Sequence, residues 1–413
     1  MKTKLVLIFA LILSFAAFAA GQRPITDLKP TVILISLDGF RYDYADKFKT
    51  PAMLELARDG VRAKWMIPSF PTKTFPNHYT IVTGLYPEHH GIVENNVWDF
   101  GERFMISDRM KVQEGRWWFG EPIWVTAQKQ GQLAASYFFV GSEAPVMGIH
   151  PKYWRSYNGK VPPEMRVDET LKWLDLPVAE RPTMLMMYFS DTDDAGHEFS
   201  PDGEETKYAA LNDDRYIARL VDGLKRRGID NEVNIIIVSD HGMASVDIRK
   251  AAFIDDYIDI EKDTDRILYT HEINQIFPKA GKLDHVYSRL QKMPYATCWK
   301  KEEIPARLHY NESSRIAPII CSTEIGHIVT SHPRYQEYTR DIFDPERPRG
   351  GHGLDNRYQE MMATFIAHGP AFKKGYVAEP FGNIEVYNIM CKILGLTPAK
   401  NDGDIARVRA LLR

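Results

Sequence analysis

Four short segments of this chain carry acidic and histidine side chains, which are types that bind metal ions in proteins. They are Asp38-Gly39, Asp193-Asp194-Ala195-Gly196-His197, Asp240-His241-Gly242 and Gly350-Gly351-His352-Gly353. Carboxylates and imidazoles together suit zinc. Two metal ions about 4 Å apart stabilise the attacking and leaving oxygens of an in-line phosphoryl displacement. Each segment alone is also compatible with a turn, a strand end or a loop, but together they predict a two-metal site for phosphoryl transfer.

A threonine between the first two segments offers a nucleophile. Thr74 stands just before Pro76, which suits the first turn of a helix that Gly84 ends. A hydroxyl at a helix N-terminus lies where backbone N–H groups and the helix dipole favour a phosphate. Because a free hydroxyl is a weak nucleophile, it needs an adjacent base or a metal ion. The four segments supply that activator.

The elements that must position these residues are predicted by continuous apolar runs. The runs cover residues 31–37, 182–189, 234–239 and 362–367, and helical patterns lie between them at 51–58, 122–130 and around 217–224. Such runs are typical of strands buried on both faces of a parallel sheet. The alternation predicts an α/β fold with a mainly parallel central sheet and helices on both faces. Ligands bind at the carboxyl ends of such strands, where three of the runs deliver acidic residues.

Roughly residues 251–330 break this alternation. The stretch is richer in charge, and its short apolar runs predict a small antiparallel subdomain inserted into one domain that covers residues 25–413. Cys298 and Cys321 end two of those runs, so a hairpin between them could join the thiols, a pairing that the sequence leaves open. With three cysteines in 413 residues, the chain is not a disulfide scaffold.

The first 20 residues have the features of a secretory signal peptide. Lys2 and Lys4 precede the apolar run 5–13, and Ala17-Phe18-Ala19 fits a cleavage site. The run is short for a membrane anchor, so we expect a secreted or periplasmic protein with no transmembrane span in the mature chain. Removing the two lysines changes the net charge from −3 to −5. That balance argues against a nucleic-acid-binding surface.

Read together, the motifs resemble the nucleotide pyrophosphatase/phosphodiesterase family of the alkaline phosphatase superfamily. The resemblance covers nearly the whole mature chain. It is carried by Leu37-Asp38-Gly39-Phe40-Arg41, Lys73-Thr74-Phe75-Pro76-Asn77-His78, Thr83-Gly84-Leu85-Tyr86-Pro87-Glu88-His89-His90-Gly91-Ile92, Asp193 with Gly196-His197, Ser239-Asp240-His241-Gly242-Met243, and His352-Gly353 with Asp355-Asn356.

The resemblance implies an alkaline phosphatase-like fold and a set of roles for the site residues. One Zn²⁺ would be held by Asp38, Asp240, His241 and the Thr74 oxygen, and a second by Asp193, His197 and His352. Thr74 would form a phosphothreonyl intermediate. Asn95 and the backbone N–H of Phe75 would stabilise a phosphate oxygen.

The substrate is also suggested by resemblance. Nucleotide-cleaving members have an aromatic residue after the nucleophile and a tyrosine in a Tyr-Asn-Gly stretch, which match Phe75 and Tyr157 here, and Tyr188 stands five residues before Asp193 as in the family. These positions imply nucleotide substrates and nucleoside 5′-monophosphate products. Phe139-Val140 departs from the Trp-Pro of many relatives, which leaves the shape of the pocket open.

Other classes remain as alternatives. Sulfatases share the fold, but His78 stands where their nucleophile motif has arginine. A phosphomonoesterase of the alkaline phosphatase type would bring an arginine and a magnesium site, for which no clear motif is found. A phosphodiesterase acting on choline phospholipids belongs to the same family. A secreted zinc-stabilised binding protein would have lost the nucleophile or a ligand, and neither is missing. The preferred nucleotide and the oligomeric state do not follow from the sequence.

Overall fold

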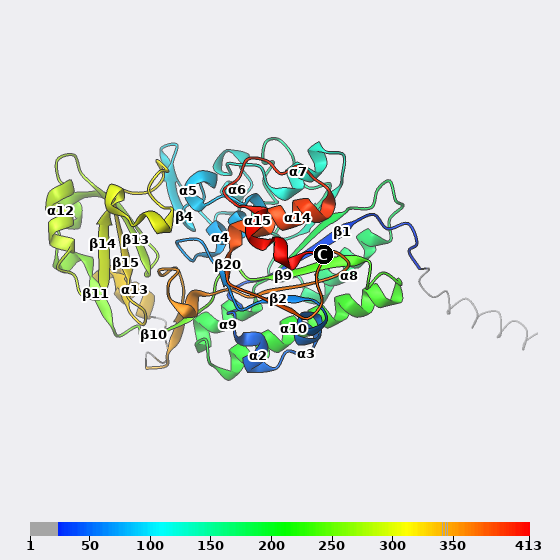
Figure 1. The fold of residues 1–413 in the computed structure, drawn as a ribbon. Coiled ribbons are helices and arrows are strands. Elements are labelled where there is room, and N and C mark those ends of the chain that lie inside the picture. Colours follow the sequence, from blue (N-terminus) through cyan, green and yellow to red (C-terminus); the bar gives the residue numbers. More distant parts are fainter. Residues whose placement is uncertain (1–23, 341, 343, 345) are drawn as a thin grey trace, which may run out of the picture.

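The computed structural model describes residues 24–413 apart from 341, 343 and 345 (Figure 1). The predicted signal peptide, residues 1–20, lies outside the described residues. Among the described helices, none combines the length and the hydropathy that a membrane span requires.

An eight-stranded sheet forms the centre of the molecule. Strand β1 pairs in parallel with β8 on one side and with β9 on the other, and only β18 runs antiparallel to its neighbours. In spatial order the strands are β19 (Tyr376–Ala378), β2 (Val61–Ala63), β18 (Phe365–His368), β9 (Val233–Val238), β1 (Thr31–Leu37), β8 (Met184–Phe189), β6 (Ala134–Tyr137) and β7 (Tyr153–Arg155). The prediction of a mainly parallel α/β fold is confirmed, and the four apolar runs correspond to β1, β8, β9 and β18.

Helices cover both faces of this sheet (Figure 1). Because side chains alternate across a strand, Val32 and Leu34 of β1 pack on one face, whereas Ile33 and Ile35 pack on the other. One face carries α4 (Thr74–Thr83), α5 (Pro87–His90), α7 (Ile123–Lys129) and α14 (Val386–Leu394). The other carries α2 (Tyr44–Phe48), α3 (Pro51–Asp59), α8 (Pro163–Leu174), α9 (Asp191–Phe199) and α10 (Glu204–Arg226).

Residues 251–330 contain a sheet of their own, seen beside the main body in Figure 1. Its four antiparallel strands are ordered β12 (Thr264–Tyr269), β13 (Ile273–Pro278), β15 (Ile319–Thr323) and β14 (Ala296–Lys300), and α12 (Leu283–Leu290) packs on it. Cys298 and Cys321 face each other on β14 and β15 and form a disulfide. The division into one domain with an insertion stays a prediction, although the antiparallel pairing is the one expected for such a subdomain.

Shorter elements complete the chain. The helices are α6 (Arg109–Val112), α11 (Ile260–Asp263), α13 (His332–Arg340) and α15 (Ile405–Val408). The two-stranded pairs are β4 (Asn96–Asp99) with β5 (Glu102–Met105), β10 (Ala244–Val246) with β17 (Arg349–Gly351), β11 (Ala251–Phe253) with β16 (Ile328–Thr330), and β3 (Met66–Ile67) with β20 (Phe381–Gly382).

Helix α4 begins earlier than the sequence suggested. Thr74 is its first residue, not the residue before it, and Lys73 is the N-cap. Gly84 ends the helix in the left-handed region at φ 68°, as expected of a glycine at that position. The threonine therefore belongs to the first turn, where backbone N–H groups have no carbonyl partner within the helix.

Candidate active site

The parallel pairing of β1 and β9 brings the first predicted ligands together. Asp38 directly follows β1, and Asp240 with His241 follows β9, which is its neighbour in the sheet. The Nε2 atom of His241 lies 3.3 Å from Asp38 Oδ1 and 3.0 Å from Asp240 Oδ2. All three side chains are buried. We call Asp38, Asp240 and His241 the strand-end group.

The other predicted ligands come from a helix and a loop. Asp193 and His197 are one turn apart on α9, and His352 lies in the glycine-rich loop after β17. His352 Nε2 is 3.1 Å from His197 Nε2 and 3.6 Å from Asp193 Oδ1. His197 Nδ1 contacts the carbonyl oxygen of Gly350 at 2.9 Å, which turns its Nε2 toward the group. We call Asp193, His197 and His352 the helix-and-loop group.

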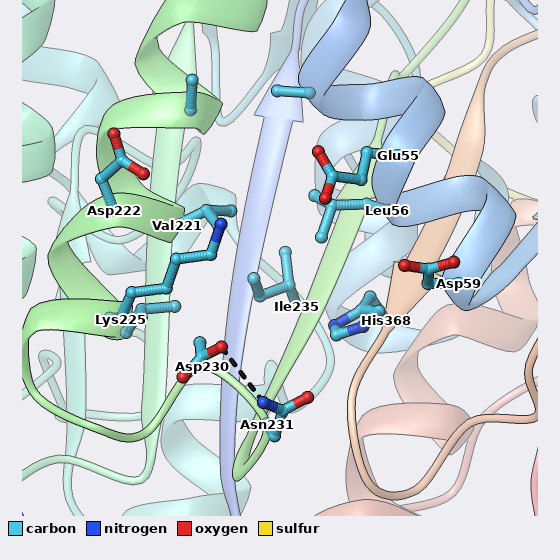
Figure 2. A pocket seen from close by; sticks show the side chains of 13 residues that line it. Glu55, Leu56, Asp59, Val221, Asp222, Lys225, Asp230, Asn231, Ile235 and His368 are labelled. Atoms are coloured by element: carbon cyan, nitrogen blue, oxygen red, sulfur yellow. Dashed lines mark hydrogen bonds between the residues drawn. The ribbon is translucent and has the colours of Figure 1, made fainter.

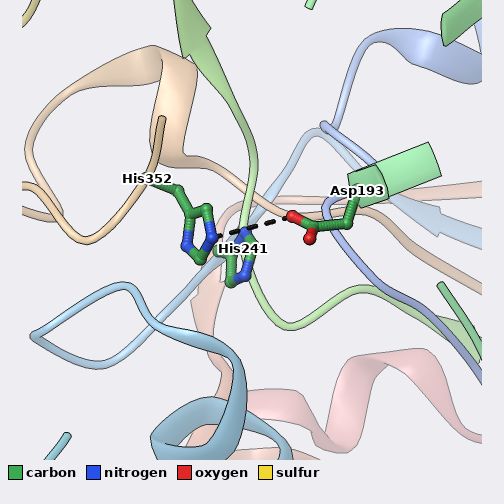
Figure 3. A group of neighbouring side chains, drawn as sticks. All are labelled: Asp193, His241 and His352. Carbon is green, nitrogen blue, oxygen red and sulfur yellow. Dashed lines mark ion pairs between the residues drawn. The ribbon is translucent and has the colours of Figure 1, made fainter. Parts of the chain in front are cut away.

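His241 connects the two groups. Its ring stacks on that of His352 with centroids 3.6 Å apart. Ligand atoms of Asp193, His241 and His352 all lie within 4.8 Å of one another, and Figure 3 shows the three side chains converging. The structure therefore brings all six predicted carboxylate and imidazole ligands into one site, with His241 next to both sets.

The charges in this site indicate that a cation belongs there. Burial raises the pKa of Asp38 well above its usual range, and the carboxylates of Asp240 and Asp193 raise it further. Among the described residues, Asp38 Oδ1, Asp193 Oδ1 and Asp240 Oδ2 are buried oxygens without a hydrogen-bond partner. Three carboxylates at such close range are unfavourable unless a positive charge lies between them.

His352 is in the protonation state that a metal requires, whereas the carboxylate of Asp240 raises the pKa of His241 against the effect of its burial. Burial lowers the pKa of His352 well below its usual range, and the nearby His241 and Lys73 lower it further. Its Nδ1 atom lies 2.9 Å from the carbonyl oxygen of Thr72, so that nitrogen carries the proton and Nε2 is free to bind. The donor set and its charge thus fit divalent metal ions held by carboxylate and imidazole ligands.

Thr74, the predicted nucleophile, lies beside the strand-end group. Thr74 Oγ1 is 3.4 Å from His241 Nε2. The N–H of Phe75 donates to Asn95 Oδ1 at 2.9 Å, so the amide oxygen of Asn95 is occupied and its NH₂ group is the side that remains to donate to an anionic oxygen. This contact places Asn95 next to Thr74.

His78 belongs to the site although the sequence did not single it out as functional. It lies on α4 one turn after Thr74, and its Nδ1 contacts the Thr74 carbonyl oxygen at 2.9 Å and Asp240 Oδ2 at 3.2 Å. Its Nε2 lies 2.8 Å from Ser36 Oγ, and the ring is fully buried. Because the carbonyl oxygen can only accept, Nδ1 carries a proton and donates to it. The spacing of four residues from Thr74 was the available signal.

Tyr188 also supports the strand-end group. Its hydroxyl donates to Asp38 Oδ2 at 2.6 Å, and its ring meets that of His78 edge-on at 5.2 Å. The sequence assigned Tyr188 to substrate binding. The structure places it both in the wall of a pocket and in direct contact with a predicted metal ligand.

A pocket of about 210 Å³ opens next to Thr74. Phe75, Tyr157 and Tyr188 line it, as do Asp38 and Asp193. The remaining lining residues are Ile106, Arg109, Val112, Phe138, Val140, Gly141, Glu143, Ser190 and Asp194. The pocket thus joins an aromatic wall to the ligand site.

Two charged residues in this pocket were not identified from the sequence as binding residues. The guanidinium of Arg109 forms an ion pair with Glu143 and lies 5.1 Å from the centre of the Tyr157 ring. Arg109 comes from α6, whereas Glu143 comes from the loop after β6. No sequence pattern relates two residues that meet only across a pocket.

A second cavity, of about 190 Å³, lies at the other end of the parallel strands (Figure 2). It is lined by residues of α3 and α10 and by Asp230 and Asn231, which precede β9. None of the predicted site residues lines it. The side chains that gather there are mainly carboxylates over an apolar floor, so it lacks the combination of ligands and nucleophile found at the carboxyl ends.

Comparison with known proteins identifies the class that this fold and site define. The chain belongs to the type I phosphodiesterase / nucleotide pyrophosphatase family, whose sequence model matches residues 32–355. The family membership predicted from the motifs is confirmed.

The chain is 37% identical over 413 residues to a venom phosphodiesterase of Macrovipera lebetinus, with 96% of this chain and 47% of the relative covered. It is 39% identical to ectonucleotide pyrophosphatase/phosphodiesterase family member 3 of Rattus norvegicus, covering 93% and 44%. The chain therefore spans about half the length of these relatives.

The match to a solved structure covers nearly all of both chains. Murine ectonucleotide pyrophosphatase/phosphodiesterase 5 is 34% identical, with a TM-score of 0.85 and coverage of 93% of this chain and 100% of the other. An inactive variant of that murine protein, in which a threonine is replaced by alanine, has been solved in complex with AMP.

Proposed function

We propose that this chain is a two-zinc phosphodiesterase and nucleotide pyrophosphatase that releases nucleoside 5′-monophosphates through a phosphothreonyl intermediate. The observation that carries the proposal is the position of Thr74. Its hydroxyl lies at the N-terminus of α4, 3.4 Å from His241, in the wall of an aromatic pocket. The murine relative, which is inactive as a threonine-to-alanine variant, supports the same role for a threonine.

The two groups of ligands are the residues that would hold the metal ions. Asp38, Asp240, His241 and the Thr74 oxygen would hold one Zn²⁺, and the helix-and-loop group would hold the other. Bound zinc supplies charge that favours the ionised form of a hydroxyl or of water and neutralises phosphate oxygens.

The residues of the chain provide the remaining chemistry. Thr74 Oγ1 attacks phosphorus, so that an O–P bond forms and the bond to the leaving oxygen breaks. The NH₂ group of Asn95 donates to a non-bridging oxygen, a contact whose loss typically costs about 10²–10³ in rate. Water then attacks the phosphothreonine, which restores the hydroxyl and releases the monophosphate.

The pocket favours a nucleotide on the reacting phosphorus. Phe75 follows the nucleophile directly, and Tyr157 lines the same pocket. Stacking of a base on an aromatic ring contributes about 1–3 kcal/mol and tolerates different bases, because each has a π-face. This predicts broad nucleotide specificity.

The same pocket favours diesters over monoesters. A monoester carries more charge on its phosphorus oxygens. Arg109 lines the pocket, but its guanidinium is ion-paired with Glu143 and is not left to neutralise that charge. A diester places its second substituent in the aromatic pocket. The ion pair of Arg109 with Glu143 thus disfavours a phosphomonoesterase.

We further propose that the protein is exported, as a secreted or periplasmic enzyme. The support is the signal peptide predicted over residues 1–20 and the similarity to venom enzymes. The disulfide between Cys298 and Cys321 suits an oxidising compartment.

A substrate panel tests the proposed function. The purified protein is assayed with a dinucleoside polyphosphate, a nucleoside triphosphate, a nitrophenyl diester, a nitrophenyl monoester and glycerophosphocholine. We expect the two nucleotides and the diester to be cleaved, with nucleoside 5′-monophosphate as a product. Faster turnover of the monoester would favour a phosphomonoesterase, and fast cleavage of glycerophosphocholine would favour a choline phospholipid phosphodiesterase.

Tyr157→Ala tests the role of the pocket. Removing the ring should lower kcat/KM for a nucleotide roughly 10-fold or more, which corresponds to about 1.4 kcal/mol per factor of ten. A methyl nitrophenyl diester, which has no base, is the control and should lose much less. An equal loss on both substrates would mean that Tyr157 supports the fold and not the base.

A further inference from the structure

A buried ion pair joins the antiparallel sheet to the residue that precedes the nucleophile. Lys73 Nζ lies 2.7 Å from Glu272 Oε2, and both side chains are more than 90% buried. Lys73 is the N-cap of α4, whereas Glu272 stands just before β13. The two residues are separated by 199 positions, so the pair ties two distant parts of the chain together.

The position of Glu272 is fixed on its own side. The preceding residue, His271, adopts a left-handed backbone with φ 65°, a conformation in which histidine, asparagine and aspartate are the most frequent residues after glycine. The carbonyl oxygen of Glu272 accepts a hydrogen bond from the N–H of Thr323 on β15 at 2.9 Å. The backbone of Glu272 is therefore held by the sheet, and its carboxylate reaches Lys73 from that position.

Two glycines leave room for the pair beside His352. A Cβ atom on Gly353 would lie 2.3 Å from Lys73 Cε, and one on Gly351 would lie 2.6 Å from Glu272 Oε1. The ion pair is thus packed directly against the backbone on both sides of a predicted metal ligand.

The same loop is bonded to the residue before Lys73. His352 Nδ1 contacts the carbonyl oxygen of Thr72 at 2.9 Å, and the N–H of Gly353 donates to Thr72 Oγ1 at 2.9 Å. Thr72, Lys73 and Thr74 are consecutive. Any movement of Lys73 would therefore be transmitted to Thr74 on one side and to the His352 loop on the other.

We propose that Lys73 and Glu272 are positioning residues, whose buried ion pair lets the antiparallel sheet fix Thr74 and His352 relative to each other. The inference rests on the proposed function for its catalytic consequence. Lys73 is not among the residues that line the pocket, and its ammonium group is held by Glu272 and by the carbonyl oxygen of Thr270 at 3.4 Å. Its ammonium group is thus paired with Glu272 outside the pocket that would take the substrate.

A double-mutant cycle tests the pair. Lys73→Met or Glu272→Leu alone leaves a buried charge without its partner, which is more disruptive than replacing both residues by apolar ones. We expect each single variant to lower kcat about 10- to 100-fold with KM little changed, since small misplacements of reacting groups have effects of that size. The double variant should recover most of the lost kcat. Glu272→Gln, which keeps the shape, should show a weaker loss.

A second ion pair, between the buried Arg315 and the half-buried Asp99, provides the control. Arg315 Nε contacts Asp99 Oδ2 at 2.7 Å and also joins the stretch 251–330 to the main body, but neither residue lines the pocket. Asp99→Asn should lower the melting temperature while leaving kcat near the wild-type value. An equal fall in kcat in this variant would mean that any loosening of this interface reduces activity, and it would overturn the specific role of Lys73 and Glu272.

The melting temperatures of the metal-free variants separate this inference from the proposed function. The single variants should melt several degrees lower, and the double variant should melt close to the wild type, which shows coupling without reference to a substrate. Additive losses in melting temperature would overturn the pair. A double variant that regains stability but stays as inactive as Lys73→Met would mean that the lysine acts on the substrate, which also overturns it. An inactive wild-type protein would overturn the proposed function alone.

Discussion

The strand-end group and the helix-and-loop group are built in different ways. Asp38, Asp240 and His241 follow two neighbouring strands whose register fixes them, with Ser36 of β1 opposite Val238 of β9. His197 lies on α9, and its side chain is 43% exposed. The strand-end group is thus fixed by the central sheet, whereas the helix-and-loop group depends on contacts between α9, the His352 loop and the antiparallel sheet.

The largest effect on turnover is expected from replacing Thr74, the proposed nucleophile beside the strand-end group. Thr74→Ala should lower turnover by at least about 10⁴-fold, because it removes the attacking oxygen. Zinc content should stay the same, since the strand-end group keeps its carboxylates and its imidazole. Steady-state kinetics and elemental analysis check both points. Thr74→Ser, which keeps a hydroxyl, should retain part of the activity, and wild-type activity in the alanine variant would refute the assignment.

The next effect tests the difference between the groups directly. His352→Ala or Asp193→Asn should leave about one zinc ion per chain and lower kcat/KM by at least about 100-fold. In the wild-type protein, a chelator should remove the ion of the more exposed helix-and-loop group first. Elemental analysis during chelation measures the order.

Asp168→Asn is the control for these variants, because Asp168 is an exposed carboxylate paired with Arg219. It should retain both ions and full activity. If the wild-type protein contains a single ion, or if both ions leave at the same rate, the proposed difference between the groups is wrong.

A smaller effect is expected from the residue behind the strand-end group. His78→Asn removes the contacts to Asp240 and Ser36 and should weaken metal binding about 10- to 100-fold, as is typical for residues that orient metal ligands. Titration of the metal-free protein with zinc measures the change. His285→Asn, at an exposed histidine, is the control. Unchanged zinc affinity in His78→Asn would show that the sheet alone positions Asp240.

The smallest effect concerns stability at low pH. It separates unfolding caused by acid from the release of metal caused by acid. His90 is buried, and burial lowers its pKa to about 3. Since the unfolded state takes up a proton below pH 6.5 and the folded state does not, stability is full above about pH 6.5 and falls as the pH drops toward 3. At pH 5 the loss is about 2 kcal/mol. His90→Gln should flatten the dependence of the melting temperature on pH in the metal-free protein.

The neighbouring His89 is the control for that measurement. Its pKa is raised, because ion pairs with Asp402 and Glu312 outweigh its partial burial. Its contribution to stability is present at low pH and is lost as the pH rises, so His89→Gln should not flatten the acid limb. If the melting temperature of His90→Gln fell with decreasing pH as steeply as that of the wild type, another group would cause the loss of stability. A loss of activity at low pH without unfolding would then reflect protonation of the metal ligands.

The candidate residues of the site and the order of the elements that carry them could be predicted from the sequence. Asp38, Asp240 and His241 follow continuous apolar runs, and such runs report buried parallel strands whose carboxyl ends meet at one edge. Thr74 was recognisable as a candidate because Pro76 marks the start of a helix and Gly84 marks its end. The strands were predictable because each depends on neighbours within a few residues, and the roles of the side chains at their ends stay predictions.

The tertiary structure alone decided how distant residues meet. The stacking of His241 on His352, the ion pair of Arg109 with Glu143 and the pair of Lys73 with Glu272 all join segments that no periodicity relates. Helix α4 also starts at Thr74 and not after it. The first residue of a helix depends on the contacts of its first turn as well as on the local sequence. The physical reason is the same in each case: a local pattern fixes which face of an element is buried, but which side chains face one another across two elements depends on how those elements pack.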